Sequence, residues 1–542
     1  MYFLLSIIWF IRTTKTVLFY LYLWQLKEYH IGRFLNHFRT YKGKRLILNK
    51  IAFSKMVILF PLLWLLLSER YLGRKLFLSV ILAAILFFYF IETFLFFKNL
   101  FQRILKRPVI TKKTVVLLGT GLLVEIVFFI FVVAEAKDVF FLSFWLLLFD
   151  ILAPLIVSFI VLLFQPATVL LRNQILKKAK IKRAKNKNLV VIGITGSYGK
   201  TSTKEFLSVI LGQKFKVLKT KEHQNSEIGI SRCILDELDS SYDVFVVEMG
   251  AYGVGGIKLL ADIVKPKIGI LTGINEQHIA LFGSQVNIIR TKYELIKSLP
   301  ENGLAVFNGD NKYCSELYRK TGSPKRMYRA EKSAESDIWA ENVKVEESRV
   351  LFEACTKEGE RAGFEANVLG RQSIPNILGS IAAARELGMS LEEISKACLK
   401  IKPEQGTMRL LEEKKDPFVI DAAYSSNPDG VIADLDYLKV WTSKKIIIMP
   451  CLIELGKMSK GIHRKIGKKI GEVCDLAVIT TKEHFNELKE GAIETGMKAD
   501  SILFSDDLED IVNKVNIISS PGDVVLLEGR VPEKLIEKLG SS

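Results

Sequence analysis

The stretch "VVIGITGSYGKTSTKEFLSVIL" occupies residues 190–211 and changes its pattern twice. Residues 189–195 are mostly β-branched, glycines and small polar residues follow, and apolar residues then recur at helical spacing from residue 201 onward. This order predicts a strand, a tight loop and a helix. Backbone N–H groups in such a loop point at a phosphate placed at the start of the helix. The stretch therefore predicts a nucleotide-binding α/β domain.

The loop also carries side chains that suit a triphosphate. Lys200 supplies a positive point charge, and Thr201 can place its hydroxyl on Mg²⁺. Ile194 stands where the common phosphate-loop pattern has its first glycine, and a chance glycine-rich turn is the alternative interpretation. Gly-Lys-Thr-Ser between a strand and a helix favours ATP. The residues expected to bind it are Gly196, Ser197, Tyr198, Gly199, Lys200, Thr201 and Ser202.

The sequence after this loop alternates strand and helix patterns. Strands are expected at residues 244–248, 268–272 and 304–308, short alternating strands at 343–367, and an Ala-rich helix at 374–387. A second series of strands is expected at residues 418–421, 445–449, 476–480, 502–504 and 524–528. Such alternation predicts mostly parallel sheets covered on both faces. We expect a central phosphate-loop ATPase domain at residues 189–405 and a Rossmann-like α/β domain at residues 406–542.

The residues before the loop belong to a different physical class. Long apolar runs occupy residues 3–26, 56–67, 76–97, 114–134 and 139–164. Because a helix needs roughly 20 residues to cross a bilayer, about five transmembrane helices are expected within residues 1–175, followed by a basic linker at 176–188. The second run is short unless residues 51–55 contribute, and Arg12 and Lys15 interrupt the first. The exact number of spans stays open.

Basic residues cluster after the first, third and fifth apolar runs. This alternation predicts a multi-pass protein of the plasma membrane whose soluble half lies in the cytoplasm. A net charge of +18 would suggest nucleic acid in a soluble protein, but here the basic clusters flank apolar runs and would meet anionic headgroups. Membrane lipids are therefore the expected partner, and nucleic acid is not. The six cysteines contain no Cys-x-x-Cys pair, which fits a reducing compartment without a metal cluster.

Further motifs follow one another along the soluble half. They are "TKEHQNSEIGIS" (220–231), "VVEMGAYGVGGIKLLADIVKPKIGILTGINEQHIALFGS" (246–284), "RTKYELI" (290–296), "GRQSIPNILGSIAAA" (370–384), "VIDAAYSSNPDG" (419–430) and "IELGKMSKGIH" (453–463). With the phosphate loop they resemble, in order, the Mur ligase family, whose members are ATP-dependent enzymes that join amino acids to peptidoglycan precursors. The resemblance is greatest to the D-alanyl-D-alanine-adding members and extends from residue 190 to residue 529.

The resemblance implies a role for each matching residue. The implied catalytic residues are Lys200, Glu248, His278 and Lys292, and the implied Mg²⁺ ligands are Thr201, Glu248, His278 and Lys292, the lysine after carbamylation. ATP would also meet Asn376 at the adenine, Arg409 at a phosphate and Asp421 at the ribose, and the substrate would meet Asn225, Tyr424 and Asn427. Taken alone, a glutamate that ends an apolar strand, as Glu248 does, is more often salt-bridged or solvated. In the implied reaction a carboxylate attacks the γ-phosphate of ATP, and an amine then displaces phosphate from the acyl phosphate.

The chain departs from the family pattern in three places. Gln372 and Ser373 replace a His-Asn pair, and Glu528, Gly529 and Arg530 replace Lys-Gly-Ser. Apolar runs stand where the family has a small uridine-binding domain. Two precursors therefore stay open: a soluble UDP-linked muramoyl tripeptide that receives D-Ala-D-Ala, or a lipid-linked muropeptide at the membrane that receives this dipeptide or another amine.

Other classes of protein remain as alternatives. An ATP-driven transporter or signalling ATPase would explain the apolar runs, but no Leu-Ser-Gly-Gly signature occurs and the runs hold few acidic groups, chiefly Glu92, Glu125 and Asp150. A folate polyglutamylating ligase shares the ATPase plan, but its loop usually carries Lys-Gly-Ser. A pseudoenzyme scaffold is disfavoured by the retained lysines and Glu248. The sequence leaves the added amino acid and the oligomeric state open.

Overall fold

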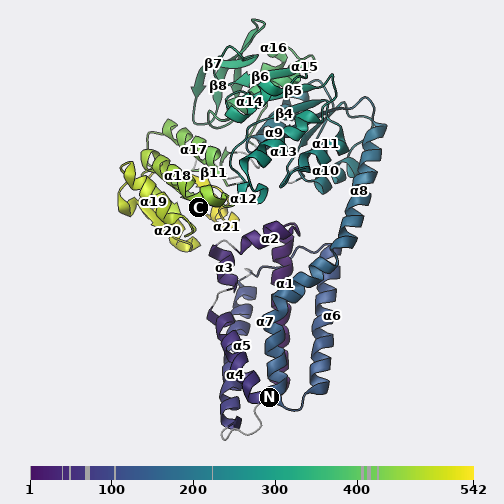
Figure 1. Ribbon diagram of the computed structural model, residues 1–542. Coiled ribbons are helices and arrows are strands. Elements are labelled where there is room, and N and C mark those ends of the chain that lie inside the picture. Colours follow the sequence, from purple (N-terminus) through teal and green to yellow (C-terminus); the bar gives the residue numbers. More distant parts are fainter. Residues whose placement is uncertain are drawn as a thin grey trace. The chain divides into compact units, whose positions relative to one another are not determined.

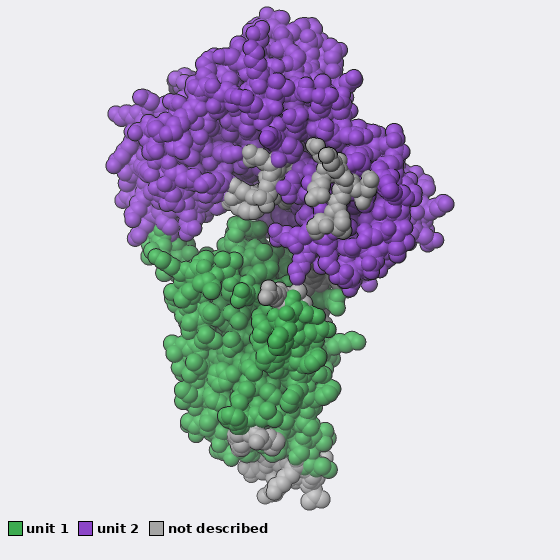
Figure 2. Space-filling view, turned by 180° about the vertical axis from the view of Figure 1, so that it is seen from behind, with its two compact units in different colours: residues 1–171 green, residues 172–542 purple. Residues whose placement is uncertain are grey.

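The computed structural model describes residues 2–38, 41–47, 50–67, 74–102, 105–221, 224–403, 408–411, 417–423 and 427–541. Contacts divide the chain into two units, residues 1–171 and 172–542, which are coloured separately in Figure 2. The first unit is helical, and the second is built around two β-sheets. These findings confirm the expected fold class, a region of long apolar helices followed by α/β domains.

Among the described residues of the first unit, five helices are long and apolar enough to cross a membrane. They are α1 (Tyr2–Leu26), α4 (Lys50–Leu67), α5 (Arg74–Phe101), α6 (Lys112–Glu135) and α7 (Val139–Leu163). Two short helices, α2 (Ile31–His37) and α3 (Tyr41–Ile47), lie between α1 and α4 in the sequence. Residues 51–55 do extend the second apolar run, and α1 continues through Arg12 and Lys15.

The packing of the first unit is centred on α7, which contacts α1, α4 and α6. The indole N–H of Trp9 donates to the carbonyl oxygen of Leu146 at 2.8 Å and so joins α1 to α7. The start of α7 is capped by Asp138, whose carboxylate accepts from the backbone N–H groups of Phe140 and Phe141 at 3.0 and 2.7 Å. Such a cap satisfies donors that the first helical turn leaves unpaired.

The second unit begins within α8 (Gln165–Lys185), so most of the expected basic linker is helical. Its larger sheet has the order β2-β3-β1-β4-β5-β6-β7-β8-β9 within the described residues. The strands are β1 (Val190–Thr195), β2 (Val217–Lys219), β3 (Val244–Glu248), β4 (Ile268–Leu271), β5 (Leu304–Asn308), β6 (Lys325–Arg329), β7 (Ile338–Val345), β8 (Val350–Thr356) and β9 (Arg361–Ala366). Pairing is parallel up to β7 and antiparallel from β7 to β9, and the short strands expected at residues 343–367 belong to this antiparallel part, which begins at Ile338.

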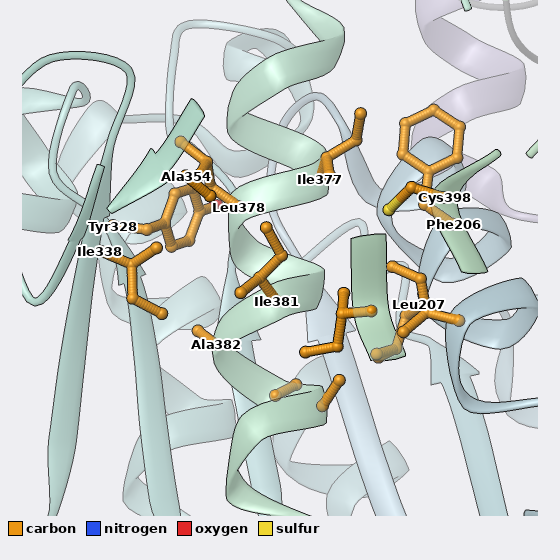
Figure 3. Close-up of a cluster of buried hydrophobic side chains, with 14 of the residues drawn as sticks. Phe206, Leu207, Tyr328, Ile338, Ala354, Ile377, Leu378, Ile381, Ala382 and Cys398 are labelled. Carbon is orange, nitrogen blue, oxygen red and sulfur yellow. The ribbon is translucent and has the colours of Figure 1, made fainter. Parts of the chain in front are cut away.

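Helices cover both faces of this sheet (Figure 1). The helices of this domain are α9 (Lys200–Leu211), α10 (Glu227–Asp236), α11 (Gly256–Val264), α12 (Ile279–Phe282), α13 (Gln285–Lys297), α14 (Lys312–Lys320), α15 (Ser373–Glu386) and α16 (Leu391–Cys398). Alternate residues of β3 serve different cores, because Val246 packs with α9 and α15 while Phe245 and Val247 pack on the opposite face. Figure 3 shows the first core, where Ile377 and Ile381 of α15 lie among side chains of α9 and the strands.

The smaller sheet has the order β10-β11-β15-β12-β13-β14 within the described residues. Its strands are β10 (Arg409–Leu410), β11 (Phe418–Ala422), β12 (Lys445–Met449), β13 (Leu476–Ile479), β14 (Ile502–Phe504) and β15 (Val524–Glu528). Pairing is parallel except between β10 and β11. The helices are α17 (Pro428–Tyr437), α18 (Ser459–Val473), α19 (Phe485–Glu494), α20 (Leu508–Ile518) and α21 (Glu533–Ser541). Apolar clusters on both faces of the strands match the expected Rossmann-like plan.

Candidate functional site

The phosphate loop connects β1 to α9, as the sequence predicts. Gly199 precedes the helix with a φ of 75°, a left-handed conformation that glycine adopts without steric cost. A Cβ atom on Gly196 would lie 2.1 Å from Oγ1 of Thr272, so the loop approaches the end of β4 too closely for any side chain. The loop therefore leads directly into the start of a helix, where an anion binds most favourably.

Lys200 lies at the first position of α9 and folds back over the loop. Its ammonium donates to the carbonyl oxygen of Gly196 at 2.8 Å. Burial lowers the pKa of Lys200, and the carboxylate of Glu248 opposes this effect. The cation is held where a phosphate group would meet the loop, as expected for a phosphate-binding lysine.

Glu248 ends β3 beside the loop, and two predicted site residues donate to its carboxylate. The hydroxyl of Thr201 donates to Oε2 at 3.0 Å, and the side-chain amide of Asn225 donates to Oε1 at 3.0 Å. Glu248 is only 6% exposed, and the ammonium of Lys204 lies 3.9 Å from Oε2. A hydroxyl and a carboxylate at this spacing are oxygen ligands of the kind that Mg²⁺ prefers. The residues present therefore fit a magnesium ion shared with a triphosphate.

Lys292 is brought into the same electrostatic neighbourhood from α13. Burial first, and the nearby Lys200 ammonium second, lower the pKa of Lys292 from 10.5 to about 7. Glu248 opposes the shift. A lysine amine with this pKa is about half neutral at pH 7, and the neutral amine is the nucleophile that carbamylation requires.

His278 lies just before α12 with a φ of 64°, in the left-handed region. Its Nδ1 is hydrogen-bonded to Glu454, which comes from the smaller-sheet domain. Burial lowers the pKa of His278, and the hydrogen bond to Glu454 opposes the shift. A carboxylate on one ring nitrogen orients the imidazole and leaves Nε2 as the nitrogen that can bind a metal.

A cavity of about 320 Å³ adjoins the phosphate loop and is lined by residues of both α/β domains. Six of the seven predicted loop residues line it, Gly196 being the exception, and so do Asn376 and Asn427. Asn376 accepts from the Thr203 hydroxyl at 3.3 Å, and a Cβ on Gly199 would lie 2.5 Å from its Oδ1. The expected proximity of Asn376 to the nucleotide loop is therefore present.

Residues of the smaller-sheet domain reach the site less directly. Arg409 and Asp421 are opposite each other in β10 and β11, and Nη2 of the arginine lies 3.0 Å from Oδ2 of the aspartate. Neither lines the cavity, although their neighbours Met408 and Ala422 do. Asn427 caps α17 and accepts from the side-chain amide of Asn275 at 3.1 Å. Tyr424, the remaining predicted substrate residue, lies outside the described residues.

Several residues of the site were not identified from the sequence. Asn275 donates to both Asn427 and Asp429 and so links the two domains, and its position after a predicted strand was an available signal. Glu454 was seen only as part of a motif. Such pairs join residues more than 150 positions apart, and local patterns carry no information about them.

Two of the three departures from the family pattern meet in the structure. The side-chain amide of Gln372 donates to Oδ1 of Asp434 at 2.7 Å, and Gln372 and Asp434 both line the cavity. Glu528 is fully buried, and burial together with the Asp434 carboxylate raises its pKa well above its ordinary value. The substitutions at Gln372 and Glu528 are therefore parts of one local arrangement.

Comparison with known proteins identifies two adjoining domains. Residues 194–384 match the family described as "Mur ligase middle domain", and residues 408–531 match the one described as "Mur ligase, glutamate ligase domain". Together these matches include more than half of the chain.

Individual relatives agree with the family matches. The chain is 30% identical over 281 residues to a UDP-N-acetylmuramoyl-tripeptide--D-alanyl-D-alanine ligase of Synechocystis, covering 52% of this chain and 59% of that one. The enzyme of the same description from Bacillus subtilis is 27% identical over 349 residues, covering 64% and 74%. The chain thus spans less than two thirds of the Synechocystis relative.

A solved structure extends the likeness to three dimensions. The MurF ligase of Thermotoga maritima in complex with ADP superposes with a TM-score of 0.58 at 26% identity, covering 68% of this chain and 83% of that one. The folds therefore agree over both α/β domains, and that relative is one whose structure holds a nucleotide.

Proposed function

We propose that this chain, which belongs to the Mur ligase family of ATP-dependent amide ligases, joins an amine to a carboxylate of a peptidoglycan precursor. The observation that carries the proposal is the arrangement around Glu248. Its carboxylate accepts from Thr201, and Lys200 of the same loop lies within electrostatic reach. This arrangement couples a phosphate-binding loop to a place for Mg²⁺, which phosphoryl transfer requires.

The loop and its lysine would bind and orient the triphosphate. Backbone N–H groups from Tyr198 to Thr201 would contact its phosphates, and Lys200 would neutralise charge that spreads over the transferring group. Thr201, Glu248, Nε2 of His278 and a carbamylated Lys292 would hold Mg²⁺. The ion, when bound, supplies charge neutralisation at the β- and γ-phosphates. Asn376, Arg409 and Asp421 are the proposed contacts to adenine, phosphate and ribose.

The chemistry is proposed to have two steps. A carboxylate oxygen of the precursor attacks the γ-phosphorus, and ADP leaves with the electron pair of the broken P–O bond. The amine nitrogen then attacks the acyl carbon, and phosphate leaves together with the former carboxylate oxygen. Positioning of the reactants supplies much of the rate enhancement in reactions of this kind. The amine loses a proton in forming the amide, and no oxidant or reductant is needed.

The proposed substrates are a muramoyl tripeptide and D-Ala-D-Ala, as for the relatives whose names state this reaction. Asn225, Tyr424 and Asn427 are the proposed substrate contacts. A lipid-linked muropeptide is the second candidate precursor, and the five long apolar helices favour it. We further propose that these helices anchor the chain in the plasma membrane with the ligase domains in the cytoplasm, as the distribution of basic residues favours.

The test is a substrate panel with the full chain in detergent micelles. UDP-linked tripeptide and its lipid-linked counterpart are each incubated with D-Ala-D-Ala, Mg²⁺ and ATP, and products are identified by mass spectrometry. The proposal predicts a product whose mass equals the sum of precursor and dipeptide less one water, formed together with one phosphate. In the control reaction, a non-hydrolysable analogue replaces ATP. Formation of neither product, with the protein folded and ATP bound, would contradict the proposal.

A further inference from the structure

The first unit contains a cavity of about 600 Å³ among its long helices. Its lining comes from α1, α3, α4, α5 and α7 and from the residues that follow α5. On α1 the lining residues extend from Arg12 to Tyr20, a distance of roughly 12 Å along the helix axis. The cavity thus runs from the middle of α1 towards the end of the bundle where Lys106 lies.

The deep end of the cavity is bounded by four charged groups that neutralise one another. Arg12 is 2.7 and 2.6 Å from the two carboxylate oxygens of Asp150, and its Nε is 2.5 Å from Glu92. Lys55 is 2.6 Å from Glu92 and 3.2 Å from Asp150. Two cations and two anions from four helices make a balanced group. Ionisable groups within membrane-spanning helices are costly unless they are paired in this way or bind a ligand.

Two further cations line the cavity without such balance. Lys15 lies on α1 one turn beyond Arg12, and Lys106 follows α5. Within the part of the chain that the structure describes, neither has a hydrogen-bond or ion-pair partner. The lining therefore holds four cationic and two anionic side chains, an excess of two positive charges. An anion in the cavity would remove this excess.

The rest of the lining is largely apolar. Phe19, Met56, Ile151 and Pro154 face the same space, and Thr16 and Asn99 add polar groups. A small inorganic anion would leave the apolar part of this volume in contact with water. An amphiphile with a phosphate headgroup and a hydrocarbon chain would satisfy both parts, because the apolar area it covers adds to the charge interaction.

We infer that the helical unit binds a lipid phosphate in this cavity, with the phosphate or diphosphate at Lys15 and Lys106 and the hydrocarbon chain against Phe19, Met56 and Ile151. The inference goes beyond the proposed ligase activity, because binding of the lipid requires neither ATP nor a reaction. An isoprenoid phosphate that carries a cell-wall precursor and a glycerolipid phosphate share this chemistry. The two sources are separated by experiment.

The experiment measures lipid binding to the full chain by native mass spectrometry from neutral detergent micelles. The probes are a polyprenyl phosphate, phosphatidic acid, the uncharged polyprenol and inorganic phosphate. We expect a lipid phosphate to bind at least tenfold more tightly than polyprenol, and inorganic phosphate not to be retained. Tightest binding of the polyprenyl phosphate assigns an isoprenoid ligand, and tightest binding of phosphatidic acid assigns a glycerolipid. Equal binding of polyprenol would overturn the inference.

Variants test the position of the phosphate. Lys15→Gln should weaken binding of the lipid phosphate about tenfold, which is the size expected for a charge-assisted hydrogen bond. Lys112→Gln is the matched control, because Lys112 is an exposed lysine at the start of α6 outside the cavity lining. Equal affinities of the two variants and the parent would overturn the inference. Because Lys15 has no hydrogen-bond or ion-pair partner among the described residues, the variant should remain folded.

Lipid binding by the helical unit and ligation by the α/β domains can be tested independently of each other. Lys200→Ala should bind the lipid phosphate as the parent does, because Lys200 belongs to the other unit. Lys15→Gln should bind ATP as the parent does. Loss of lipid binding by Lys200→Ala would overturn the assignment to the helical unit, whereas failure of the substrate panel would leave the lipid measurement unaffected.

Discussion

The two units each contain a group of buried charges, and the groups differ in balance. In the first unit, Arg12 and Lys55 are matched by Glu92 and Asp150, each within 3.2 Å of a partner. In the second, burial lowers the pKa of both Lys200 and Lys292, the Lys200 ammonium lowers that of Lys292 further, and Glu248 opposes both shifts. A balanced group holds helices together. An unbalanced group fits an anionic ligand that restores neutrality.

The largest effect is expected on stability, when a variant removes one charge from the balanced buried group of the first unit. Arg12→Met leaves Glu92 and Asp150 with Lys55 alone, and removing one partner of a buried ion pair costs about 3–5 kcal/mol. The free energy of unfolding of the full chain in mixed micelles measures this effect. Lys112→Met, at an exposed lysine, should cause no measurable change. Equal stability of Arg12→Met and the parent would contradict the view that the group is structural.

The next effect is expected on the chemistry of the second unit. Lys200→Ala should lower the rate of ligation by about 100–1000-fold, the size seen when one preorganised charge-stabilising group is removed from an active site. Stability should change little, because the hydrogen bonds of the ammonium within the described residues go to carbonyl oxygens of its own loop. The matched control is Lys267→Ala, at an exposed lysine before β4. Ligation by Lys200→Ala at the parent's rate would contradict a role of the Lys200 ammonium in the reaction.

A smaller effect is expected from the backbone of the phosphate loop. Gly199→Ala places a Cβ at a φ of 75°, which costs about 1–2 kcal/mol, and brings it 2.5 Å from Oδ1 of Asn376. The variant should be less stable and should bind ATP more weakly. Gly322→Ala is the control, because nothing lies within 4 Å of its added Cβ. Isothermal titration with ATP and thermal unfolding distinguish the two variants, and equal behaviour would contradict the close packing of the loop.

The smallest effect concerns the pH dependence of stability without metal or nucleotide. Below pH 7 the folded chain carries the buried Lys292 ammonium, whereas above pH 7 the folded amine is neutral and the unfolded lysine stays charged up to about pH 10.5. The unfolded state therefore binds more protons, so the free energy of unfolding should rise with pH, by about 1 kcal/mol between pH 6 and 8. Lys292→Met should remove this rise. If the free energies of unfolding of the parent and of Lys292→Met changed with pH in parallel, the low pKa of Lys292 would be contradicted.

The architecture was predictable wherever a few neighbouring residues determine it. Strand ends at Glu248, Met449 and Glu528 were predicted to the residue, because β-branched runs and flanking turns lie within a few positions of them. The phosphate loop was equally clear, since its glycines and lysine are contiguous. The long helices followed from apolar length alone.

The tertiary arrangement of charges could not be predicted in this way. Arg12 and Lys15 were expected only as interruptions of an apolar run, yet Arg12 pairs with an aspartate 138 residues away. Arg409 and Asp421 are expected to contact a phosphate and the ribose of ATP, and their pairing across β10 and β11 was not predicted. The contact of His278 with Glu454 joins residues 176 positions apart. Such contacts depend on the fold, which brings together residues that no local pattern relates.

If ATP activates a substrate carboxylate as an acyl phosphate, one oxygen atom of that carboxylate must be transferred to the released phosphate. A precursor whose reacting carboxyl group carries ¹⁸O in both positions is ligated by the full chain, and the released phosphate is analysed by mass spectrometry. We expect one ¹⁸O atom in each phosphate, because the bridging oxygen leaves with phosphorus when the amine attacks. Phosphate that contains no ¹⁸O, formed together with the ligated product, would contradict activation as an acyl phosphate.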